Sequence, residues 1–163
     1  MSSKITKLAE QIVEKCTEYG LKISTAESIT GGMISAAITS VPGSSAVIEL
    51  GVCSYSNRIK REILGVSHKT LEQFTEYSLQ CAEEMAKGAM KASGADFAAA
   101  TSGIAGPSGG TPDNPVGTVY ICVCSKSESV CKRYVFEDKE RGPIREAAAE
   151  MALSMLLSIM KGE

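Results

Sequence analysis

Histidine and tryptophan are almost missing from this sequence, whose 163 residues include one histidine, His68, and no tryptophan. Six cysteines are present, but no two of them form a C-x-x-C pair. Because zinc sites use closely spaced cysteine and histidine ligands, we expect no structural metal. A Ser-His-Asp triad is also poorly supported, since His68 lies in the ordinary helix-start sequence "VSHKTL". Most of the cysteines fall at apolar positions, so we expect buried free thiols in a reducing compartment.

Long apolar runs and an excess of positive charge are missing as well. The sequence has no run of eighteen apolar residues, and its first twenty residues are amphipathic. The formal net charge is −2 and the basic residues are scattered, which argues against the dense positive surface that nucleic acids require. We therefore expect a cytoplasmic protein that binds neither membranes nor nucleic acids. A small charged substrate in one local pocket is compatible with this composition.

The chain length and the apolar content fit a single domain. With 44% hydrophobic and 22% charged residues, 163 residues can form a sizeable core. No internal repeat, low-complexity tract or linker is visible in the sequence. We therefore predict one domain over residues 1–163.

Helical and strand patterns alternate along the chain. Apolar spacing predicts helices at 5–16, 33–40, 57–65, 67–75, 78–92 and 144–159. β-Branched and apolar runs predict strands at 21–27, 45–55, 96–104, 117–127 and 129–137. A short polar turn joins the last two strands as an antiparallel hairpin, while the other strands alternate with helices. This order favours a layered α/β fold with a mixed sheet.

Two glycine-rich turns follow predicted strands. "TAESITGG" covers residues 25–32, and "SGIAGPSGG" covers residues 102–110. Ligands of open α/β sheets bind at the carboxyl ends of strands, and glycine lets the main chain approach a ligand closely. If the two strands are parallel neighbours, both turns face one crevice. Two tight turns without a binding role remain the alternative.

These turns and the segment between them resemble a known family. "TAESITGG", "VPGSSAVIELGVCSYSNRIKREILGV" and "TSGIAGPSGGTPDNPVGTVY" are similar to the signature blocks of the competence/damage-inducible protein A C-terminal domain family, the nicotinamide-nucleotide amidases. The resemblance is close over residues 23–120. It implies a three-layer α/β/α sandwich with a mixed, mostly parallel central sheet, and neither metal nor cofactor. It also implies hydrolysis of nicotinamide mononucleotide to nicotinate mononucleotide and ammonia, in pyridine nucleotide recycling.

The resemblance suggests catalytic roles for three residues. Amide hydrolysis needs a nucleophile, a base, an acid for the leaving nitrogen and donors for the oxyanion. The family pattern implies Ser45 as the nucleophile, Lys60 as its general base and Tyr55 in the wall of the site. A buried lysine can act as a base because desolvation lowers its pKa and leaves a neutral amine. Ser28, in the sharp turn after the first strand, is the rival nucleophile, although it lacks the G-x-S-x-G pattern.

Residues in the two turns and at the start of the last helix are expected to bind the substrate. They are Ser28, Thr30, Gly31, Gly32, Ser102, Gly103, Ile104, Ala105, Gly106, Arg141 and Arg145. The turns would lay main-chain groups against the carboxamide. The two arginines are expected at the 5′-phosphate, since guanidinium groups near a helix amino terminus suit a dianion. Glu27 is interpreted either as an anchor of the first turn or as a simple helix-start acid.

Departures from the family pattern leave alternatives open. Ile29 stands where relatives often carry cysteine, and Leu79 stands where they often carry glutamate. The alternatives are a nucleotide-binding or regulatory module without turnover and an amidase for another small amide. We expect a stand-alone domain without the larger amino-terminal domain of many bacterial relatives. Like those relatives, it is expected to form a homodimer or a higher homo-oligomer.

Overall fold

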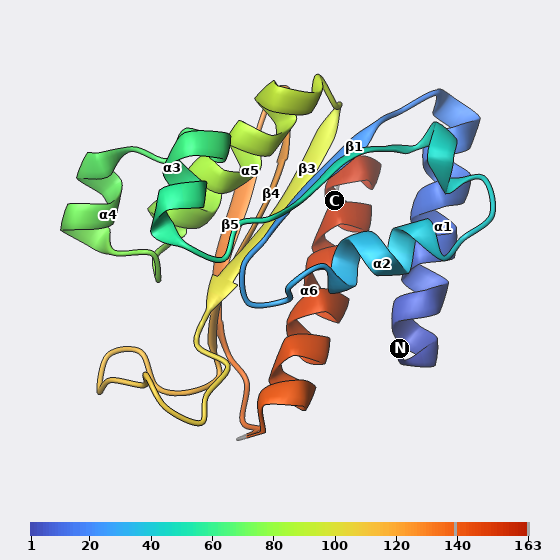
Figure 1. Cartoon of the computed structure of the whole chain (residues 1–163). Coiled ribbons are helices and arrows are strands. Elements are labelled where there is room, and N and C mark those ends of the chain that lie inside the picture. Colours follow the sequence, from blue (N-terminus) through green and yellow to red (C-terminus); the bar gives the residue numbers. More distant parts are fainter. Residues whose placement is uncertain (139, 163) are drawn as a thin grey trace.

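Strands and helices follow one another in the order that the sequence patterns predict (Figure 1). The computed structural model describes residues 1–138 and 140–162. The strands are β1 (Ile23–Glu27), β2 (Ile48–Cys53), β3 (Phe97–Gly103), β4 (Thr118–Ser125) and β5 (Ser129–Val135). The helices are α1 (Ser3–Tyr19), α2 (Met33–Thr39), α3 (Asn57–Leu64), α4 (His68–Phe74), α5 (Leu79–Ser93) and α6 (Arg141–Lys161). A 3-10 helix, Ser44–Ala46, precedes β2.

The five strands form one mixed sheet in the order β2-β1-β3-β4-β5. β1 pairs in parallel with both β2 and β3, whereas β4 pairs antiparallel with β3 and β5. In the β1–β3 register, Ala26 lies opposite Ala100 and Glu27 lies opposite Thr101. The strands that precede the two glycine-rich turns are therefore parallel neighbours, as the crevice hypothesis requires.

Helices cover both faces of the sheet, which confirms the predicted three-layer sandwich (Figure 1). α1, α2 and α6 pack on one face over a core of large aliphatic side chains such as Ile12, Ile121 and Leu156. α3, α4 and α5 lie on the other face, where the core is rich in alanine from β3 and α5. All five residues of β1 are buried, because this strand lies between two others and beneath both helical layers. Its polar side chains therefore need partners inside the protein.

The helix α3 is held unusually close to α5. A Cβ atom at Gly88 of α5 would lie 1.9 Å from the carbonyl oxygen of Leu64, the last residue of α3. Only glycine lets the two backbones approach this closely. At its other end, α3 is capped by the preceding residue, Ser56, whose hydroxyl accepts a hydrogen bond from the Ile59 N–H. Both ends of this short helix are thus fixed, which positions Lys60 in its first turns.

One expectation about the cysteines is wrong. Cys122 of β4 and Cys131 of β5 form a disulfide, with their Cα atoms 4.0 Å apart. The antiparallel register brings the two residues directly opposite each other, a pairing that their spacing along the chain does not reveal. The other four cysteines, Cys16, Cys53, Cys81 and Cys124, are free, and all but Cys53 are buried. Among the described residues, no helix is long and apolar enough to cross a membrane.

Candidate active site

Ser28, Tyr55 and Lys60 lie near the carboxyl ends of the three parallel strands. Hydrogen bonding continues beyond the strands, since the Ser28 N–H donates to the Thr101 carbonyl at 2.9 Å. On the other side of β1, the Ser54 N–H donates to the Glu27 carbonyl at 2.8 Å. Ser28 therefore lies between the ends of β2 and β3, directly after β1. This is the position at which open α/β sheets bind ligands.

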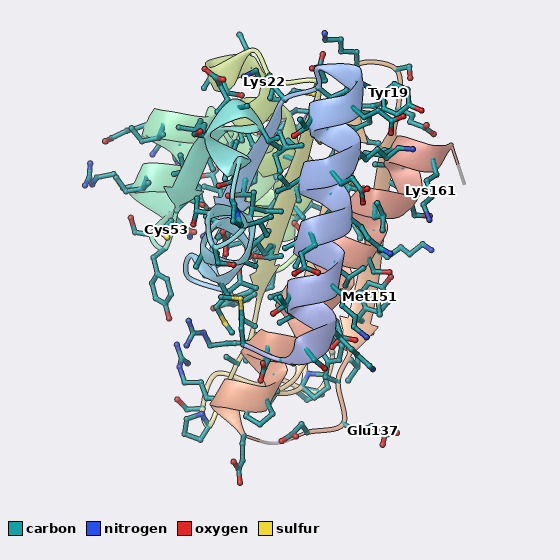
Figure 2. The ribbon with its side chains drawn as sticks, turned by 90° about the vertical axis from the view of Figure 1, so that its right-hand side faces the viewer. Tyr19, Lys22, Cys53, Glu137, Met151 and Lys161 are labelled. Carbon is teal, nitrogen blue, oxygen red and sulfur yellow. A yellow bond between two sulfur atoms is a disulfide. The ribbon has the colours of Figure 1, made fainter. Side chains whose placement is uncertain are left out.

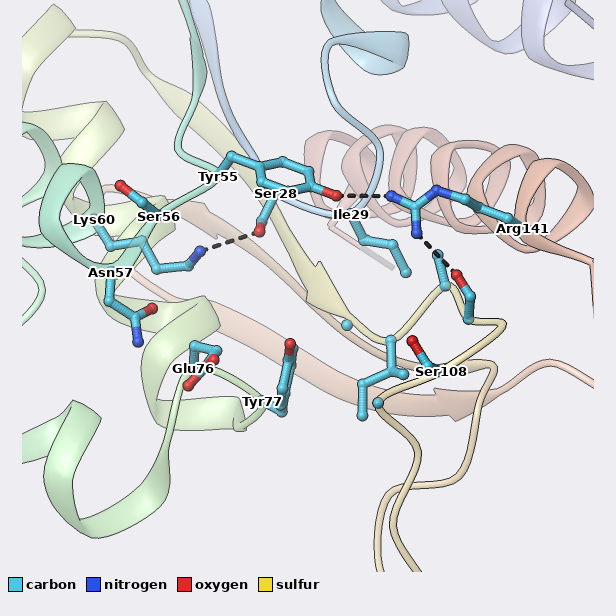
Figure 3. Close-up of a pocket in the computed structure, with 15 residues that line it drawn as sticks. Ser28, Ile29, Tyr55, Ser56, Asn57, Lys60, Glu76, Tyr77, Ser108 and Arg141 are labelled. Atoms are coloured by element: carbon cyan, nitrogen blue, oxygen red, sulfur yellow. Dashed lines mark hydrogen bonds between the residues drawn. The ribbon is translucent and has the colours of Figure 1, made fainter.

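Lys60 projects from α3 toward this edge of the sheet. Its side chain is 1% exposed, although lysine is seldom buried in proteins. The amine Nζ donates to the Ser54 carbonyl at 2.8 Å and to the Ser28 Oγ at 3.0 Å (Figure 3). Burial lowers the pKa of Lys60, and the nearby Cys81 and Glu76 side chains partly oppose that shift. A serine hydroxyl beside a buried lysine whose pKa is lowered has the geometry of a nucleophile and general-base pair.

Glu27 fixes the turn that carries Ser28. Its carboxylate is fully buried. The carboxylate accepts hydrogen bonds from the N–H groups of Gly32, Ile34 and Ser35, at 3.0, 3.0 and 2.8 Å. The hydroxyls of Thr30 and Ser35 donate to it as well, both at 2.7 Å. Glu27 therefore anchors the turn, as one interpretation held. It is not a helix-start acid, since the first turn of α2 contains no acidic residue and Glu27 reaches the helix N–H groups from the end of β1.

A cavity of about 390 Å³ opens in front of the Ser28–Lys60 pair. It is lined by Ser28, Ile29, Tyr55, Ser56, Asn57, Lys60, Glu76, Tyr77, Gly103, Ile104, Ala105, Gly106, Ser108, Gly109 and Arg141. In Figure 3, Ser28 and Tyr55 lie on one side of the cavity and Glu76 and Tyr77 lie on the other. Among the described residues, no group of three or more histidine, cysteine or acidic side chains is arranged to hold a metal ion.

Eight of the expected site residues line this cavity. They are Ser28, Tyr55, Lys60, Gly103, Ile104, Ala105, Gly106 and Arg141. Arg141 crosses the cavity mouth, where it donates to the Tyr55 hydroxyl at 2.7 Å and to the Gly106 carbonyl at 3.0 Å. The positively charged guanidinium group of Arg141 thus lies at the rim of the cavity, held by one hydrogen bond to Tyr55 and one to Gly106.

Ser45 is not part of the cavity, and the expected proximity of Ser45 to Lys60 is wrong. Ser45 is exposed in the 3-10 helix that leads into β2, whereas Lys60 lies beyond the carboxyl end of that strand. A strand rises about 3.3 Å per residue, so the six residues of β2 separate the two by the length of the sheet. In Figure 2, Lys22 lies near the top of the view and Cys53, the last residue of β2, lies below it. Lys22 marks the end at which Ser45 lies, because its amine donates to the carbonyl of the next residue, Ala46. The serine beside Lys60 is Ser28.

The remaining expected binding residues support the cavity wall without lining it. Arg145 donates from Nε to the Ile29 carbonyl and from Nη2 to the Thr30 carbonyl, both at 3.0 Å. Thr30 is buried and bonds to Glu27 and Thr101. Gly31 and Gly32 have positive φ values of 57° and 97°, which permit the sharp turn into α2. The Ser102 hydroxyl donates to the Glu76 carbonyl at 2.7 Å and so fixes the opposite wall.

Sequence reasoning missed several residues of the cavity. They are Ile29, Ser56, Asn57, Glu76, Tyr77, Ser108 and Gly109. Most of these residues are neighbours in sequence of residues that were expected at the site, so proximity along the chain could have identified them. Glu76 and Tyr77 are different, because they follow α4 and no local pattern links them to either glycine-rich turn. Only the packing of α5 against β3 brings this segment to the site.

Comparison with known proteins identifies the family. The model of the CinA C-terminal domain matches residues 5–160. The chain belongs to the CinA C-terminal domain family. The resemblance carried by the two turns and by the segment between them is therefore confirmed.

Relatives of this CinA domain share its sequence over nearly its whole length. A CinA-like protein of Shewanella amazonensis is 42% identical over 97% of this chain. A putative competence-damage inducible protein of Caldicellulosiruptor saccharolyticus is 47% identical over 91% of it. The chain spans only 37% and 36% of the length of these two relatives.

Solved structures share the fold of this CinA domain as well. The competence/damage inducible protein CihA from Agrobacterium tumefaciens is 41% identical, with a TM-score of 0.95, and the match covers 98% of this chain and 97% of that one. A CinA superfamily protein from Klebsiella pneumoniae is 30% identical, with a TM-score of 0.92, over 98% and 99% of the two chains.

Proposed function

We propose that this CinA domain is a nicotinamide-nucleotide amidase in which Ser28 is the nucleophile and Lys60 is the general base. The observation that carries the proposal is the 3.0 Å distance between Lys60 Nζ and Ser28 Oγ, at a lysine that is 1% exposed. A buried amine beside a hydroxyl in an open cavity is the arrangement that metal-independent acyl transfer needs.

The chemistry follows from this pair. Ser28 Oγ forms a bond to the carboxamide carbon while the neutral amine of Lys60 takes the hydroxyl proton. The proton then passes to the amide nitrogen, the carbon–nitrogen bond breaks and ammonia leaves, with an ester on Ser28 remaining. Water adds to this ester with Lys60 again as the base, which restores Ser28 and releases nicotinate mononucleotide. The hydrogen bond to the Ser54 carbonyl keeps the amine aimed at Ser28 throughout.

Donors for the developing oxyanion are available on the second glycine-rich turn. Ala105 and Gly106 line the cavity, and their N–H groups donate to no residue that the structure describes, so they are the donors we assign to the oxyanion. Backbone donors fixed in this way stabilise a tetrahedral intermediate without reorganisation. Arg141, at the cavity rim, is the group we assign to the 5′-phosphate. Arg145 is not assigned to the phosphate, because it does not line the cavity and its guanidinium supports the Ser28 turn through the Ile29 and Thr30 carbonyls.

The test is ammonia release from four amides by the purified protein. Nicotinamide mononucleotide is the expected substrate, and nicotinamide, nicotinamide riboside and glutamine should react much more slowly. Preference for one of the three other compounds would indicate an amidase for another small amide. Tight binding of the nucleotide with no ammonia release at high protein concentration would favour a regulatory nucleotide-binding module.

A further inference from the structure

Glu76 is the only acidic side chain among the described residues that line the cavity. Its carboxylate makes no hydrogen bond or ion pair with any described residue, whereas its backbone carbonyl accepts from the Ser102 hydroxyl at 2.7 Å. A carboxylate that faces a binding cavity without a partner is free to interact with a ligand. The mechanism above does not use it.

The backbone around Glu76 is held in a strained conformation. The preceding residue, Thr75, has a φ of 64°, and it is the one described residue other than glycine with a positive φ. Such a conformation costs about 1 kcal/mol or more and persists only where neighbouring contacts impose it. Here the Ser78 hydroxyl donates to the Thr75 carbonyl at 3.0 Å, and the Tyr77 N–H donates to the Thr75 hydroxyl at 3.2 Å. The direction in which Glu76 and Tyr77 leave the chain is therefore fixed.

Two tyrosines accompany this carboxylate at the cavity. Tyr77 lies next to Glu76 on one side, and Tyr55 lies on the other (Figure 3). Burial, the Glu76 charge and the nearby Tyr55 hydroxyl all raise the pKa of Tyr77, as expected for groups that share a confined space. Aromatic faces attract cations through the ring quadrupole, and a carboxylate adds to that attraction.

The charges along the cavity are unequally distributed. Arg141 is bound to Tyr55 and Gly106 at the rim, whereas Glu76 lies on the opposite side of the cavity, toward Lys60 (Figure 3). An N-substituted pyridinium nucleotide has the matching distribution, with a cationic ring at one end and an anionic phosphate at the other. We infer that Glu76, with Tyr77 and Tyr55, selects ligands whose carboxamide-bearing ring is cationic over ligands whose ring is neutral. This inference rests on the proposed function in taking a nicotinamide ring as the ligand.

The experiment measures binding without turnover. In a Ser28→Ala background, chemical-shift titrations at one pH compare the 1-methylnicotinamide cation with neutral nicotinamide, two probes that share the carboxamide and lack the phosphate. The cation should bind more tightly. Adding Glu76→Gln should weaken cation binding by roughly threefold to tenfold and leave nicotinamide binding unchanged. Glu10→Gln, which removes the same charge from an exposed position on α1, is the matched control and should change neither affinity.

A second variant separates the ring from the carboxylate. Tyr77→Phe keeps the aromatic face and should retain the cation preference, whereas Tyr77→Ala should reduce it. Equal binding of the two probes in the Ser28→Ala protein would overturn the inference, and so would a cation preference that Glu76→Gln leaves intact.

The result of this binding experiment can be distinguished from the result of the ammonia-release test of the proposed function. Ammonia release from nicotinamide mononucleotide together with no Glu76-dependent preference would leave the amidase proposal standing and remove the selection role. A Glu76-dependent preference without ammonia release would support the selection role and count against the amidase proposal.

Discussion

The two ends of the parallel strands carry the same three kinds of side chain in different surroundings. At the amino-terminal end, Ser45 is exposed, and Lys22 and Glu49 form a solvent-exposed ion pair with 3.9 Å between Nζ and Oε2. At the carboxyl end, Glu27 is fully buried, Lys60 is 1% exposed and Ser28 lies at the cavity. Residue type is therefore a poor guide to reactivity. The surroundings decide which serine and which lysine can react.

The direction of the parallel strands explains why the buried glutamate, the buried lysine and the cavity serine meet at the carboxyl end. Parallel strands send all their outgoing turns to one edge, where helix amino termini present free N–H groups. At that edge Glu27 satisfies the N–H groups of α2, and its carboxylate fixes the Ser28 turn in place. At the other edge, the Lys22 side chain donates to the Ala46 carbonyl and pairs with the exposed Glu49 carboxylate. An exposed ion pair of this kind contributes little to stability, typically about 0–1 kcal/mol.

The largest expected difference between the two ends is in catalysis. Ser28→Ala and Lys60→Ala should each lower kcat for nicotinamide mononucleotide by a factor of about a thousand or more, because each removes one partner of the proton transfer. Ser45→Ala and Lys22→Ala are the matched controls and should stay within about twofold of the parent rate. Steady-state ammonia release checks all four. A Ser45→Ala protein as inactive as Ser28→Ala would refute the assignment of the nucleophile.

A smaller contrast is expected in stability between two glutamates. Glu27→Ala should lower the free energy of unfolding by about 3 kcal/mol or more, since it leaves the N–H groups of Gly32, Ile34 and Ser35 without this partner. Glu49→Ala, at the exposed end, should change it by no more than about 0.5 kcal/mol. Urea unfolding of both variants measures the difference. Equal losses of unfolding free energy in the two variants would show that Glu27 does not stabilise the Ser28 turn.

The two arginines near the start of α6 should differ in their effect on the substrate. Arg141→Ala should raise KM for nicotinamide mononucleotide roughly tenfold or more and should have little effect on nicotinamide riboside, which lacks the phosphate. Arg145→Ala should affect both substrates alike, because this residue supports the Ser28 turn through the Ile29 and Thr30 carbonyls. A phosphate-specific loss in Arg145→Ala would reverse the two roles.

The smallest expected effect is a shift in pH dependence. Burial lowers the pKa of Lys60, so kcat/KM should fall as the pH drops through that lowered value and the base becomes protonated. The negative charge of Glu76 raises the pKa of Lys60. Glu76→Gln should therefore move the acidic limb to lower pH, whereas the control Glu10→Gln should leave it in place. An acidic limb that moves to higher pH would contradict this electrostatic coupling.

Stability should depend on pH with the same sign. The folded protein binds a proton at Lys60 less readily than the unfolded chain, whose lysine has the ordinary pKa of 10.5. Stability from this group should therefore rise with pH between the lowered folded pKa and the unfolded value. Lys60→Met should remove this dependence.

Local patterns in the sequence determined the helices, the strands and the two glycine-rich turns. Apolar periodicity and turn residues act over a few neighbours, so they can be read without knowledge of the fold. The resemblance to the family singled out Lys60 and Tyr55, and the glycine-rich pattern singled out the 103–106 turn; all of these residues line the cavity. The glycine-rich pattern also raised the hypothesis that the turns after β1 and β3 share one edge of the sheet, on the condition that the two strands are parallel neighbours, and this condition is met.

Only the tertiary structure decided which serine faces Lys60. Ser28 and Ser45 both lie close to β1 or β2 in the chain, and strand direction alone sends them to opposite edges of the sheet. Strand register likewise paired Cys122 with Cys131, and the packing of α5 brought Glu76 and Tyr77 to the cavity. These outcomes depend on contacts between residues that are far apart in sequence. Such contacts form when side chains are buried together in the folded core, and local sequence patterns do not encode them.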